Sequence, residues 1–269
     1  MLTASKSPLI SVIMGVYYRR DDTLPLIGSV KSIMEQTVSD FEFLICDDGS
    51  AKEAVSALDD LASRDSRIRL LRHGGLFTLP QKLNFCLDNA RGRYIARMDD
   101  DDWSYPKRFE RQIAALEENS GIDFVGSNVE IWFNGENTGE RIFPEFPEIN
   151  DFLFVQPFIH PTLLFRSRVF SNQRFSEDKH CLLCEDYDLL LRLYARSMTG
   201  MNIQDFLYRY TVDPSRTKKM RYRLNESITR YKRFGELGLL PRALPYVVKP
   251  LAVGLIPNGL LQKIKKKTQ

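Results

Sequence analysis

Residues 94–103, Tyr-Ile-Ala-Arg-Met-Asp-Asp-Asp-Asp-Trp, join a short apolar run to four consecutive aspartates. Adjacent carboxylates repel one another, and aspartate is unfavourable inside helices and strands, so the acidic run is expected in a loop at the end of a strand. An acidic run by itself is typical of a solvated surface loop. The alternative is a site for a divalent cation that carries a phosphorylated substrate, because Mg²⁺ and Mn²⁺ prefer oxygen ligands.

The residues before this run alternate between apolar runs and amphipathic helical patterns. Strands are predicted at 9–14, 41–46, 68–72 and 94–98, and helices at about 24–34, 51–64 and 80–90. This alternation is typical of βαβ units on a parallel sheet. The sequence therefore predicts an α/β fold with a doubly wound, mostly parallel sheet.

Polar residues follow three of the predicted strands. Tyr17, Asp47-Asp48 and the run 99–102 each stand directly after an apolar run. Right-handed crossovers would bring these strand ends to one edge of the sheet, where such folds bind ligands. Gly49-Ser50 and Gly74-Gly75 do not fit a dinucleotide-binding or P-loop motif, so those two classes are disfavoured.

The second half of the chain is less regular. Pro106 is expected to open a helix, and 122–133 reads as a long strand that returns as a hairpin through 141–143 after a turn at 134–139. Glu185 and Asp186 begin a further helical pattern. They are either capping residues at a helix start or, if one faces a cleft, a general base.

The composition is that of a globular protein. The chain has 269 residues, of which 43% are hydrophobic and 27% charged, which fits one large domain or one domain with an appendage. It has four cysteines and no segment that resembles a secretory signal peptide, so a reducing cytoplasm with buried thiols is expected. The Cys181–Cys184 spacing has no second pair, which disfavours a zinc site.

Positive charge gathers at the C-terminal end. From Arg216 onward there are 14 Lys and Arg residues against two Glu, which leaves the rest of the chain acidic. The longest uncharged stretch there, 250–262, is too short to span a bilayer, but a basic amphipathic segment is suited to an anionic membrane surface. The alternatives are a solvated basic helix pair and an oligomer contact. The acidic body disfavours nucleic acid as a partner.

Together the motifs resemble the inverting glycosyltransferases of family 2, which have the GT-A fold. Residues 11–17 resemble the family's first-strand motif SVIMPVYN, and 41–50 resemble DFELIVVDDGS. Residues 83–84 and 90–102 resemble its LN and A.GxYIARMDADD elements, followed by the P.R.E.Q pattern at 106–112. The similarity covers about residues 8–210. It departs from the family at Gly15, Tyr18 and Asp100, where Pro, Asn and a small residue are frequent.

The resemblance implies a nucleotide site and a catalytic base. Tyr17 would lie against the base, Asp48 would accept from the uracil imide N–H, and Asp47 would support it. Asp99, Asp100 and Asp101 match the DXD element, which binds the ribose and Mn²⁺ or Mg²⁺; Asp101 and Asp99 are the metal candidates, and which carboxylates contact the metal stays open.

Further residues of the second half match family elements. Asp186 matches the expected general base, with Glu185 as the neighbouring alternative. His160 would contact the diphosphate or the acceptor, although a single histidine is often structural. Trp103 would line the sugar or acceptor site or serve only packing.

The resemblance also implies an organisation and a reaction. A catalytic domain at 1–212 would comprise a nucleotide-binding half (1–105) and an acceptor-binding half (106–212), followed by the basic extension 213–269. A hexose from a UDP-sugar, UDP-galactose or UDP-glucose, would pass to a saccharide linked to an undecaprenyl-type lipid diphosphate. The reaction would take place at the cytoplasmic face of the inner membrane and form a β-linkage in O-antigen, capsule or exopolysaccharide. The rival functions are a sugar-nucleotidyltransferase and a non-catalytic nucleotide-sugar-binding protein.

Overall fold

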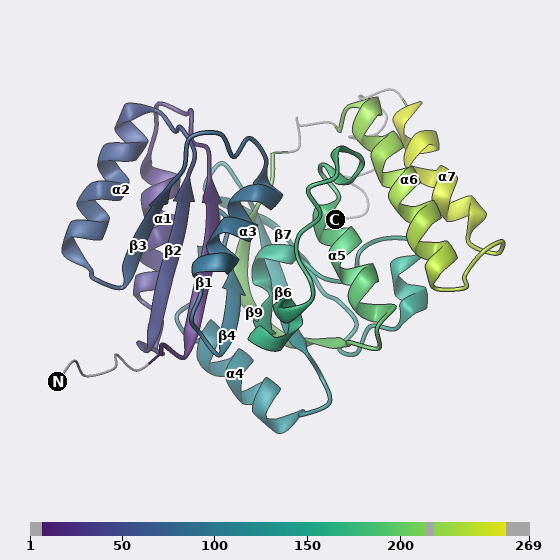
Figure 1. The fold of residues 1–269 in the computed structure, drawn as a ribbon, viewed down its shortest axis with the longest axis horizontal. Helices are drawn as coiled ribbons and strands as arrows, with labels where there is room; N and C mark the ends of the chain where they lie inside the picture. Colours follow the sequence, from purple (N-terminus) through teal and green to yellow (C-terminus); the bar gives the residue numbers. More distant parts are fainter. Residues whose placement is uncertain (1–6, 214–217, 257–269) are drawn as a thin grey trace.

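The computed structural model describes residues 7–213 and 218–256, and within them the strands form one nine-stranded sheet (Figure 1). The order along the sheet is β3-β2-β1-β4-β8-β6-β9-β5, and β7 pairs with β6. The strands are β1 (Ile10–Val16), β2 (Phe41–Asp47), β3 (Ile68–Arg72), β4 (Tyr94–Arg97), β5 (Trp103–Ser104), β6 (Phe124–Phe133), β7 (Glu136–Arg141), β8 (Leu164–Arg166) and β9 (Gly200–Thr211).

Helices cover both faces of the sheet. The α-helices are α1 (Leu24–Met34), α2 (Lys52–Arg64), α3 (Leu79–Asn89), α4 (Arg108–Glu118), α5 (Glu185–Tyr194), α6 (Met220–Glu236) and α7 (Leu244–Gly254). Short 3₁₀ helices lie at Ile149–Phe152, His160–Thr162, Ser167–Ser171 and Lys179–Cys181.

The N-terminal half has the predicted parallel arrangement. Strands β3, β2, β1 and β4 are parallel neighbours, and α1, α2 and α3 are the connections between them. Side chains alternate between the two faces of β1: Val12 and Met14 share a core with α1, whereas Ile13 shares a core with α3. Because successive side chains of a strand point to opposite faces, one apolar strand serves both layers.

Two predicted boundaries in the second half are wrong. Helix α4 begins at Arg108 with Lys107 as its N-cap, so Pro106 precedes the helix; its carbonyl accepts a hydrogen bond from the backbone N–H of Thr37 instead. The hairpin turns at Asn134-Gly135, both with positive φ, and β7 begins inside the expected turn. An Asn-Gly pair favours this two-residue turn, which matches the twist of the paired strands.

Three strands were not predicted from the sequence. Strand β8 has three residues and pairs antiparallel with both β4 and β6. Strand β9 lies parallel to β6 with two register shifts, and β5 pairs antiparallel with β9. Short or irregular strands of this kind depend on partners far away in the sequence, and their local pattern is weak.

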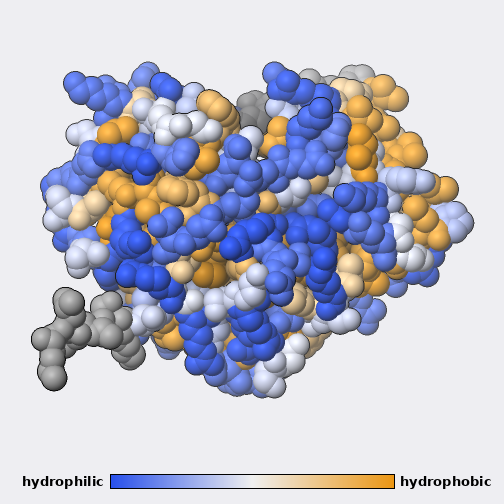
Figure 2. All heavy atoms as spheres, viewed as in Figure 1, coloured by the Kyte–Doolittle hydropathy of each residue, from blue (hydrophilic) through white to orange (hydrophobic). Residues whose placement is uncertain are grey.

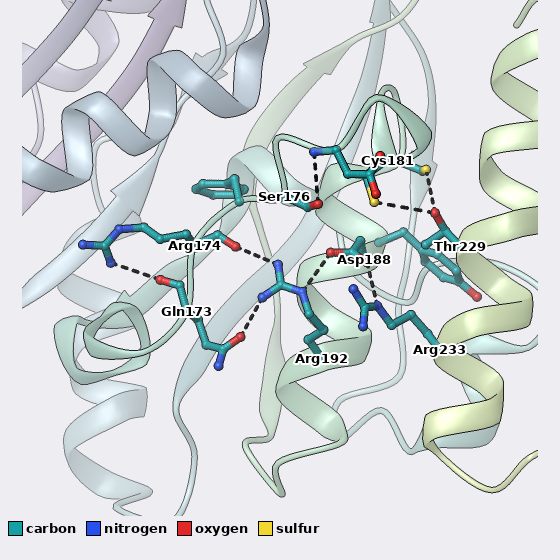
Figure 3. Close-up of polar contacts among 12 residues, drawn as sticks. Gln173, Arg174, Ser176, Cys181, Asp188, Arg192, Thr229 and Arg233 are labelled. Carbon is teal, nitrogen blue, oxygen red and sulfur yellow. Dashed lines mark hydrogen bonds and ion pairs between the residues drawn. The ribbon is translucent and has the colours of Figure 1, made fainter.

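Helix α6 packs against α5, and α7 packs against α6 (Figure 1). Phe234 of α6 and Val247 of α7 are buried in the same core as the leucines of α5. The buried carboxylate of Asp188 accepts hydrogen bonds from Arg192 of its own helix and Arg233 of α6 (Figure 3). Residues 257–269, which carry the last four lysines of the basic tail, lie outside the described part of the chain.

All four cysteines are buried thiols without a disulfide, as the sequence predicts. Cys184 lies 3.5 Å from the Thr229 hydroxyl of α6, and Cys181 lies 3.9 Å from it (Figure 3). These contacts add to the attachment of α6 beside the start of α5.

Candidate active site

A pocket of about 460 Å³ lies at the carboxyl ends of β1, β2 and β3. Its lining residues are Tyr17, Arg19, Asp48, Gly49, Gly74, Gly75 and Phe77. The Asp48 carboxylate accepts a hydrogen bond of 2.9 Å from the backbone N–H of Gly75. Gly75 has φ +118°, a conformation that residues with a Cβ rarely adopt, so glycine allows this close approach. The structure therefore brings Tyr17 and Asp48 into one pocket.

The Tyr17 ring provides an aromatic surface beside two cations. Its side chain is 57% exposed. The Arg19 guanidinium lies 4.9 Å from the ring centroid, and the Lys82 ammonium lies 5.5 Å from it. An exposed aromatic ring with nearby cations is suited to a nucleobase that carries phosphates.

Asp47 shapes the loop that carries Asp48. Its Oδ1 accepts a hydrogen bond of 3.1 Å from the backbone N–H of Ser50. The Ser50 hydroxyl in turn accepts a hydrogen bond of 2.8 Å from the backbone N–H of Tyr18. Asp47 thus connects the loop after β2 to the loop after β1, which agrees with a supporting position.

The four aspartates after β4 have different partners. Asp99 forms an ion pair with Arg97, and Asp101 forms one with Arg20 at 2.9 Å. Asp102 is buried, and its Oδ1 accepts a hydrogen bond of 2.7 Å from the backbone N–H of Thr211. Asp102 therefore holds the acidic loop against β9, while the other aspartates are at least partly exposed.

The acidic loop carries more negative charge than its cations balance. Burial and the carboxylates of Asp101 and Asp99 raise the pKa of Asp100 to about 7. Burial also raises the pKa of Asp99, although the Arg97 guanidinium opposes this. The carboxylate of Asp186 adds to the rise for Asp99. Asp186 therefore interacts electrostatically with the acidic loop.

Helix α5 begins with the two carboxylates Glu185 and Asp186. The Oδ2 of Asp186 accepts a hydrogen bond of 3.1 Å from the Gln156 amide, and its Oδ1 accepts one of 2.8 Å from the backbone N–H of Tyr187. Glu185 is buried, and burial with the neighbouring Asp186 charge raises its pKa to about 7. Of the two, Asp186 is the more accessible to a substrate.

A sequence profile described as Glycosyl transferase family 2 matches residues 11–176, more than half of the chain. The chain belongs to glycosyl transferase family 2. Two curated relatives of this family 2 chain are similar along most of their length. The putative glycosyltransferase EpsE of Bacillus subtilis (strain 168) is 31% identical over 98% of this chain and 95% of its own. The O-antigen biosynthesis glycosyltransferase WbnJ of Escherichia coli is 34% identical over 78% of this chain and 82% of its own.

Solved structures share the fold of this family 2 chain at low sequence identity. Staphylococcus aureus TarS 1-349 in complex with UDP-GlcNAc has a TM-score of 0.69 at 15% identity, covering 96% of this chain and 79% of TarS. The mannosyltransferase PcManGT from Pyrobaculum calidifontis, in complex with GDP-Man and Mn²⁺, has a TM-score of 0.63 at 15% identity, covering 98% of this chain and 81% of PcManGT. The predicted GT-A fold is confirmed.

The acidic loop of this family 2 glycosyltransferase fits a divalent cation that is held jointly with a substrate. Within residues 7–213 and 218–256, no three His, Cys, Asp or Glu side chains form a ready-made metal cage. Mg²⁺ usually takes one or two carboxylates together with phosphate oxygens and water, so such a cage is not required. Burial raises the pKa of Asp100, and the carboxylates of Asp101 and Asp99 raise it further; a cation would relieve this second contribution.

His160 lies in the interior of this family 2 domain. It is 7% exposed and packs edge-on against Phe175 with 5.3 Å between ring centroids. Burial and the nearby Arg97 charge lower its pKa well below 6.5, so the imidazole is neutral. The structure thus places His160 beside Arg97, and its contact with a substrate stays a prediction.

Arg97 is a site residue to which the sequence analysis assigned no role. It is 1% exposed in β4, and its Nη2 pairs with Asp99. Its Nε and Nη1 have no hydrogen-bond partner among the described residues. A buried cation is costly unless it is paired, so Arg97 and Asp99 depend on each other. The signal in the sequence was an arginine at the end of an otherwise apolar strand.

Proposed function

We propose that the chain is an inverting, metal-dependent hexosyltransferase that uses a UDP-sugar donor, UDP-galactose or UDP-glucose. The acceptor would be a saccharide linked to an undecaprenyl-type lipid diphosphate, and the product a β-linked sugar of a bacterial surface polysaccharide. The observation that carries the proposal is the meeting of Tyr17 and Asp48 in one pocket at the strand ends, with Arg20 of the same loop paired to Asp101 of the acidic run. Asp186 at the start of α5 supplies a carboxylate for proton transfer, and its charge contributes to the raised pKa of Asp99 in the acidic loop.

Two findings support a nucleotide-sugar donor. TarS was solved with UDP-GlcNAc and PcManGT with GDP-Man, and both share the fold of this chain. In the first pocket, Tyr17 offers a stacking surface, and the Asp48 carboxylate is an acceptor for the single imide N–H of uracil. The choice among hexoses rests on the family resemblance.

Asp101 and Asp99 are the residues that would hold Mn²⁺ or Mg²⁺, with Asp100 beside them. When bound, the cation would neutralise negative charge on the departing diphosphate. Arg20 lies 2.9 Å from Asp101 and Arg97 pairs with Asp99, so each proposed ligand is already oriented by an arginine. Such oriented ligands need little rearrangement when substrate arrives.

In the proposed mechanism, Asp186 accepts the proton of an acceptor hydroxyl. The hydroxyl oxygen then forms a bond to the anomeric carbon as the bond from that carbon to the diphosphate oxygen breaks, and UDP departs with the bonding electrons. A single displacement inverts the anomeric centre, so an α-linked donor yields a β-linked product. The Gln156 amide and the backbone N–H of Tyr187 at the start of α5 orient the Asp186 carboxylate.

A membrane location is part of the proposal, and an exposed apolar face supports it. Apolar side chains recur every three or four residues along α6 and remain exposed, and further exposed apolar side chains lie on α7 or directly after it. They are Met220, Leu224, Ile228 and Tyr231 of α6, Leu244 and Val248 of α7, and Leu255 after α7. The two helices pack together, with Gly254 against Met220. Figure 2 shows apolar residues gathered over this end of the molecule.

Basic residues lie beside this α6–α7 face. Lys219, Arg221 and Lys232 are exposed on α6 or at its start, and four lysines follow after residue 262 in the sequence. Apolar stripes beside basic side chains are complementary to an anionic bilayer surface. In the described part of the chain, no helix has the length and apolar character needed to cross a membrane. We therefore propose peripheral attachment at the cytoplasmic face of the inner membrane.

Vesicle sedimentation of the full chain tests the attachment. Binding is expected to vesicles that contain phosphatidylglycerol and to fall with rising salt, and the double variant Leu224→Glu with Val248→Glu is expected to lose it. Ile142→Glu, at an exposed apolar residue elsewhere, is the matched control. Equal sedimentation of the wild type and the double variant overturns this part of the proposal. A double variant that binds vesicles like the wild type but has lost the ability to dimerise would overturn it too, because the face would then be an oligomer contact.

The central experiment measures transfer from a panel of UDP-sugars to a synthetic lipid-diphosphate GlcNAc acceptor, with and without EDTA. Transfer from one UDP-hexose that EDTA abolishes and Mn²⁺ restores is expected. Asp186→Asn is expected to retain UDP binding and to lose transfer by about 10²- to 10⁴-fold, the contribution of a general base. Asp60→Asn, at an exposed carboxylate, is the control.

An additional assay with a sugar phosphate and UTP separates the rival functions. A sugar-nucleotidyltransferase would release pyrophosphate from a sugar phosphate and UTP, and a binding protein would retain the UDP-sugar without any turnover. Undiminished transfer by Asp186→Asn would instead assign the base to another residue, with Glu185 the first candidate.

A further inference from the structure

A second pocket, of about 310 Å³, adjoins the acidic loop. Its walls come from the start of α1, from β5, from the β6–β7 turn and from the end of β9. The residues that define its chemistry are Asp101, Trp103, Trp132, Phe133, Arg209 and Thr211. Its volume lies at the lower end of the range of about 300–1,000 Å³ found for small-molecule sites.

The aromatic wall of this second pocket is held in place by polar contacts. The Trp132 indole N–H donates to the Glu130 carboxylate at 2.9 Å. The Tyr105 hydroxyl donates to the same carboxylate at 2.7 Å and accepts from Arg209 Nε at 2.9 Å. The Arg209 guanidinium stacks 4.5 Å from the Trp132 ring centroid. The Trp132 ring is therefore fixed before any ligand binds, which lowers the entropy cost of binding.

Trp103 is positioned from the opposite side. Its ring atoms come within 3.7 Å of the position that a Cβ would take at Gly28 of α1. Its backbone pairs with Arg209 of β9. Both tryptophans thus stand on paired strands rather than on long loops, as suits a site that must keep its shape.

Asp101 belongs both to the proposed donor site and to this second pocket. Its carboxylate pairs with Arg20, from the loop that also carries Tyr17 and Arg19 of the first pocket. The Thr211 hydroxyl donates to the Asp101 carbonyl oxygen at 2.6 Å. The second pocket is therefore continuous with the acidic loop at which the donor diphosphate would lie.

The chemistry of the second pocket favours a pyranose ring. One face of such a ring is made of C–H groups and packs on flat aromatic surfaces, while the hydroxyls at its rim donate hydrogen bonds to carboxylates. Asp101 and Asp102 at the wall disfavour a phosphate group inside the pocket itself. Aromatic plates beside carboxylate acceptors are thus complementary to a neutral sugar.

We propose that the second pocket binds a saccharide ring of the acceptor and thereby selects the acceptor. This inference rests on the proposed transferase function for its role in catalysis, but saccharide binding itself is independent of turnover. Trp132 is the specificity-determining residue, because its fixed ring supplies the stacking surface.

Tryptophan fluorescence tests the binding directly. The chain contains two tryptophans, and both line the second pocket, so their emission reports on it alone. We expect a saturable change when the full-length protein is titrated with methyl β-glucoside, methyl β-galactoside or N-acetylglucosamine. Sorbitol, an open-chain polyol, should give no saturation. The proposal is overturned if all three sugars give the same response as sorbitol. It is also overturned if UDP gives a saturable response and none of the sugars does.

Variants of Trp132 locate the site. Trp132→Ala should weaken saccharide binding about ten-fold, read from the remaining Trp103, because a stacked aromatic contact is lost. Trp132→Phe keeps a ring and should stay close to the wild type. Phe146→Ala, at an exposed aromatic residue outside the pocket, is the matched control. Unchanged affinity in Trp132→Ala contradicts the assignment.

Kinetics then separate this inference from the proposed function. Trp132→Ala is expected to raise the KM of the acceptor about ten-fold and to leave the KM of the UDP-sugar unchanged. A rise confined to the KM of the donor would assign the pocket to the donor and overturn the inference. Saccharide binding by a protein that transfers no sugar would instead contradict the transferase function and leave the second pocket as a saccharide site.

Discussion

Asp188 of α5 and Arg233 of α6 form an ion pair of 2.7 Å between Oδ1 and Nε, and the Asp188 side chain is 1% exposed (Figure 3). Arg192 pairs with the other carboxylate oxygen at 2.8 Å. The pair joins α6 to the helix that begins with Glu185 and Asp186. The position of the proposed base therefore depends on a helix from the C-terminal part of the chain.

Loss of this buried carboxylate should destabilise the fold. Asp188→Asn is expected to lower the free energy of unfolding by about 3 kcal/mol, because two arginines lose their charged partner. Urea denaturation measures this. Asp60→Asn, in an exposed pair with Arg64, should change it by less than about 0.5 kcal/mol. Similar midpoints for the two variants would contradict the importance of the buried pair.

Glu185 should make stability fall as pH rises towards neutrality. Its pKa is about 7 in the folded protein against 4.5 ordinarily, so the folded state binds the proton more tightly. Between about pH 4.5 and about pH 7 the folded chain holds more protons than the unfolded chain, and the free energy of unfolding declines, by up to about 3 kcal/mol.

The variant Glu185→Gln removes the carboxyl group that binds this proton. It should make the decline shallower but not abolish it, because the contribution of Asp100, whose pKa is also about 7, remains in this pH range. The variant should be at least as stable as the wild type above neutral pH, measured by urea denaturation across a pH series. A decline of the same slope in the variant would show that the proton binds elsewhere.

Glu42 should make stability fall as pH decreases, which is opposite to the effect of Glu185. Burial favours a raised pKa, but hydrogen bonds from Arg91, Ser11 and Arg69 outweigh it and lower the pKa. Its contribution to stability is thus complete above the pKa of the unfolded chain and is lost as pH falls through the lowered pKa. Glu42→Gln should cost about 1–3 kcal/mol at neutral pH and lose less stability than the wild type on acidification. Thermal unfolding at several pH values checks both.

Substitution of Asp101 should affect UDP binding, whereas substitution of Asp102 should affect the Tm. Asp101 is partly exposed and contacts Arg20, whereas Asp102 is buried and accepts from the backbone N–H of Thr211. Asp101→Asn is expected to keep the Tm and to weaken Mn²⁺-dependent UDP binding about ten-fold or more. Asp102→Ala is expected to lower the Tm because a buried backbone donor loses its acceptor. Calorimetry measures binding and Tm; the reverse pattern would exchange the two roles.

Local sequence patterns determined the parallel half of this protein. Each strand from β1 to β4 is a short apolar run, and each connecting helix has its own amphipathic period, so neighbouring residues suffice to specify them. The convergence of Tyr17, Asp48 and the acidic run at one edge also followed, because parallel strands share the direction of their carboxyl ends. The family motifs added the expected roles of these residues.

The tertiary structure decided the rest of the site. Strand β9 finds its register only against β6 and β5, and Asp102 is held by Thr211 more than one hundred residues away. The pairings of Arg20 with Asp101 and of Asp188 with Arg233 likewise join distant segments. Interstrand hydrogen bonds, ion pairs and shared pockets form between segments that the chain brings together only on folding. Neighbouring residues carry little information about such contacts.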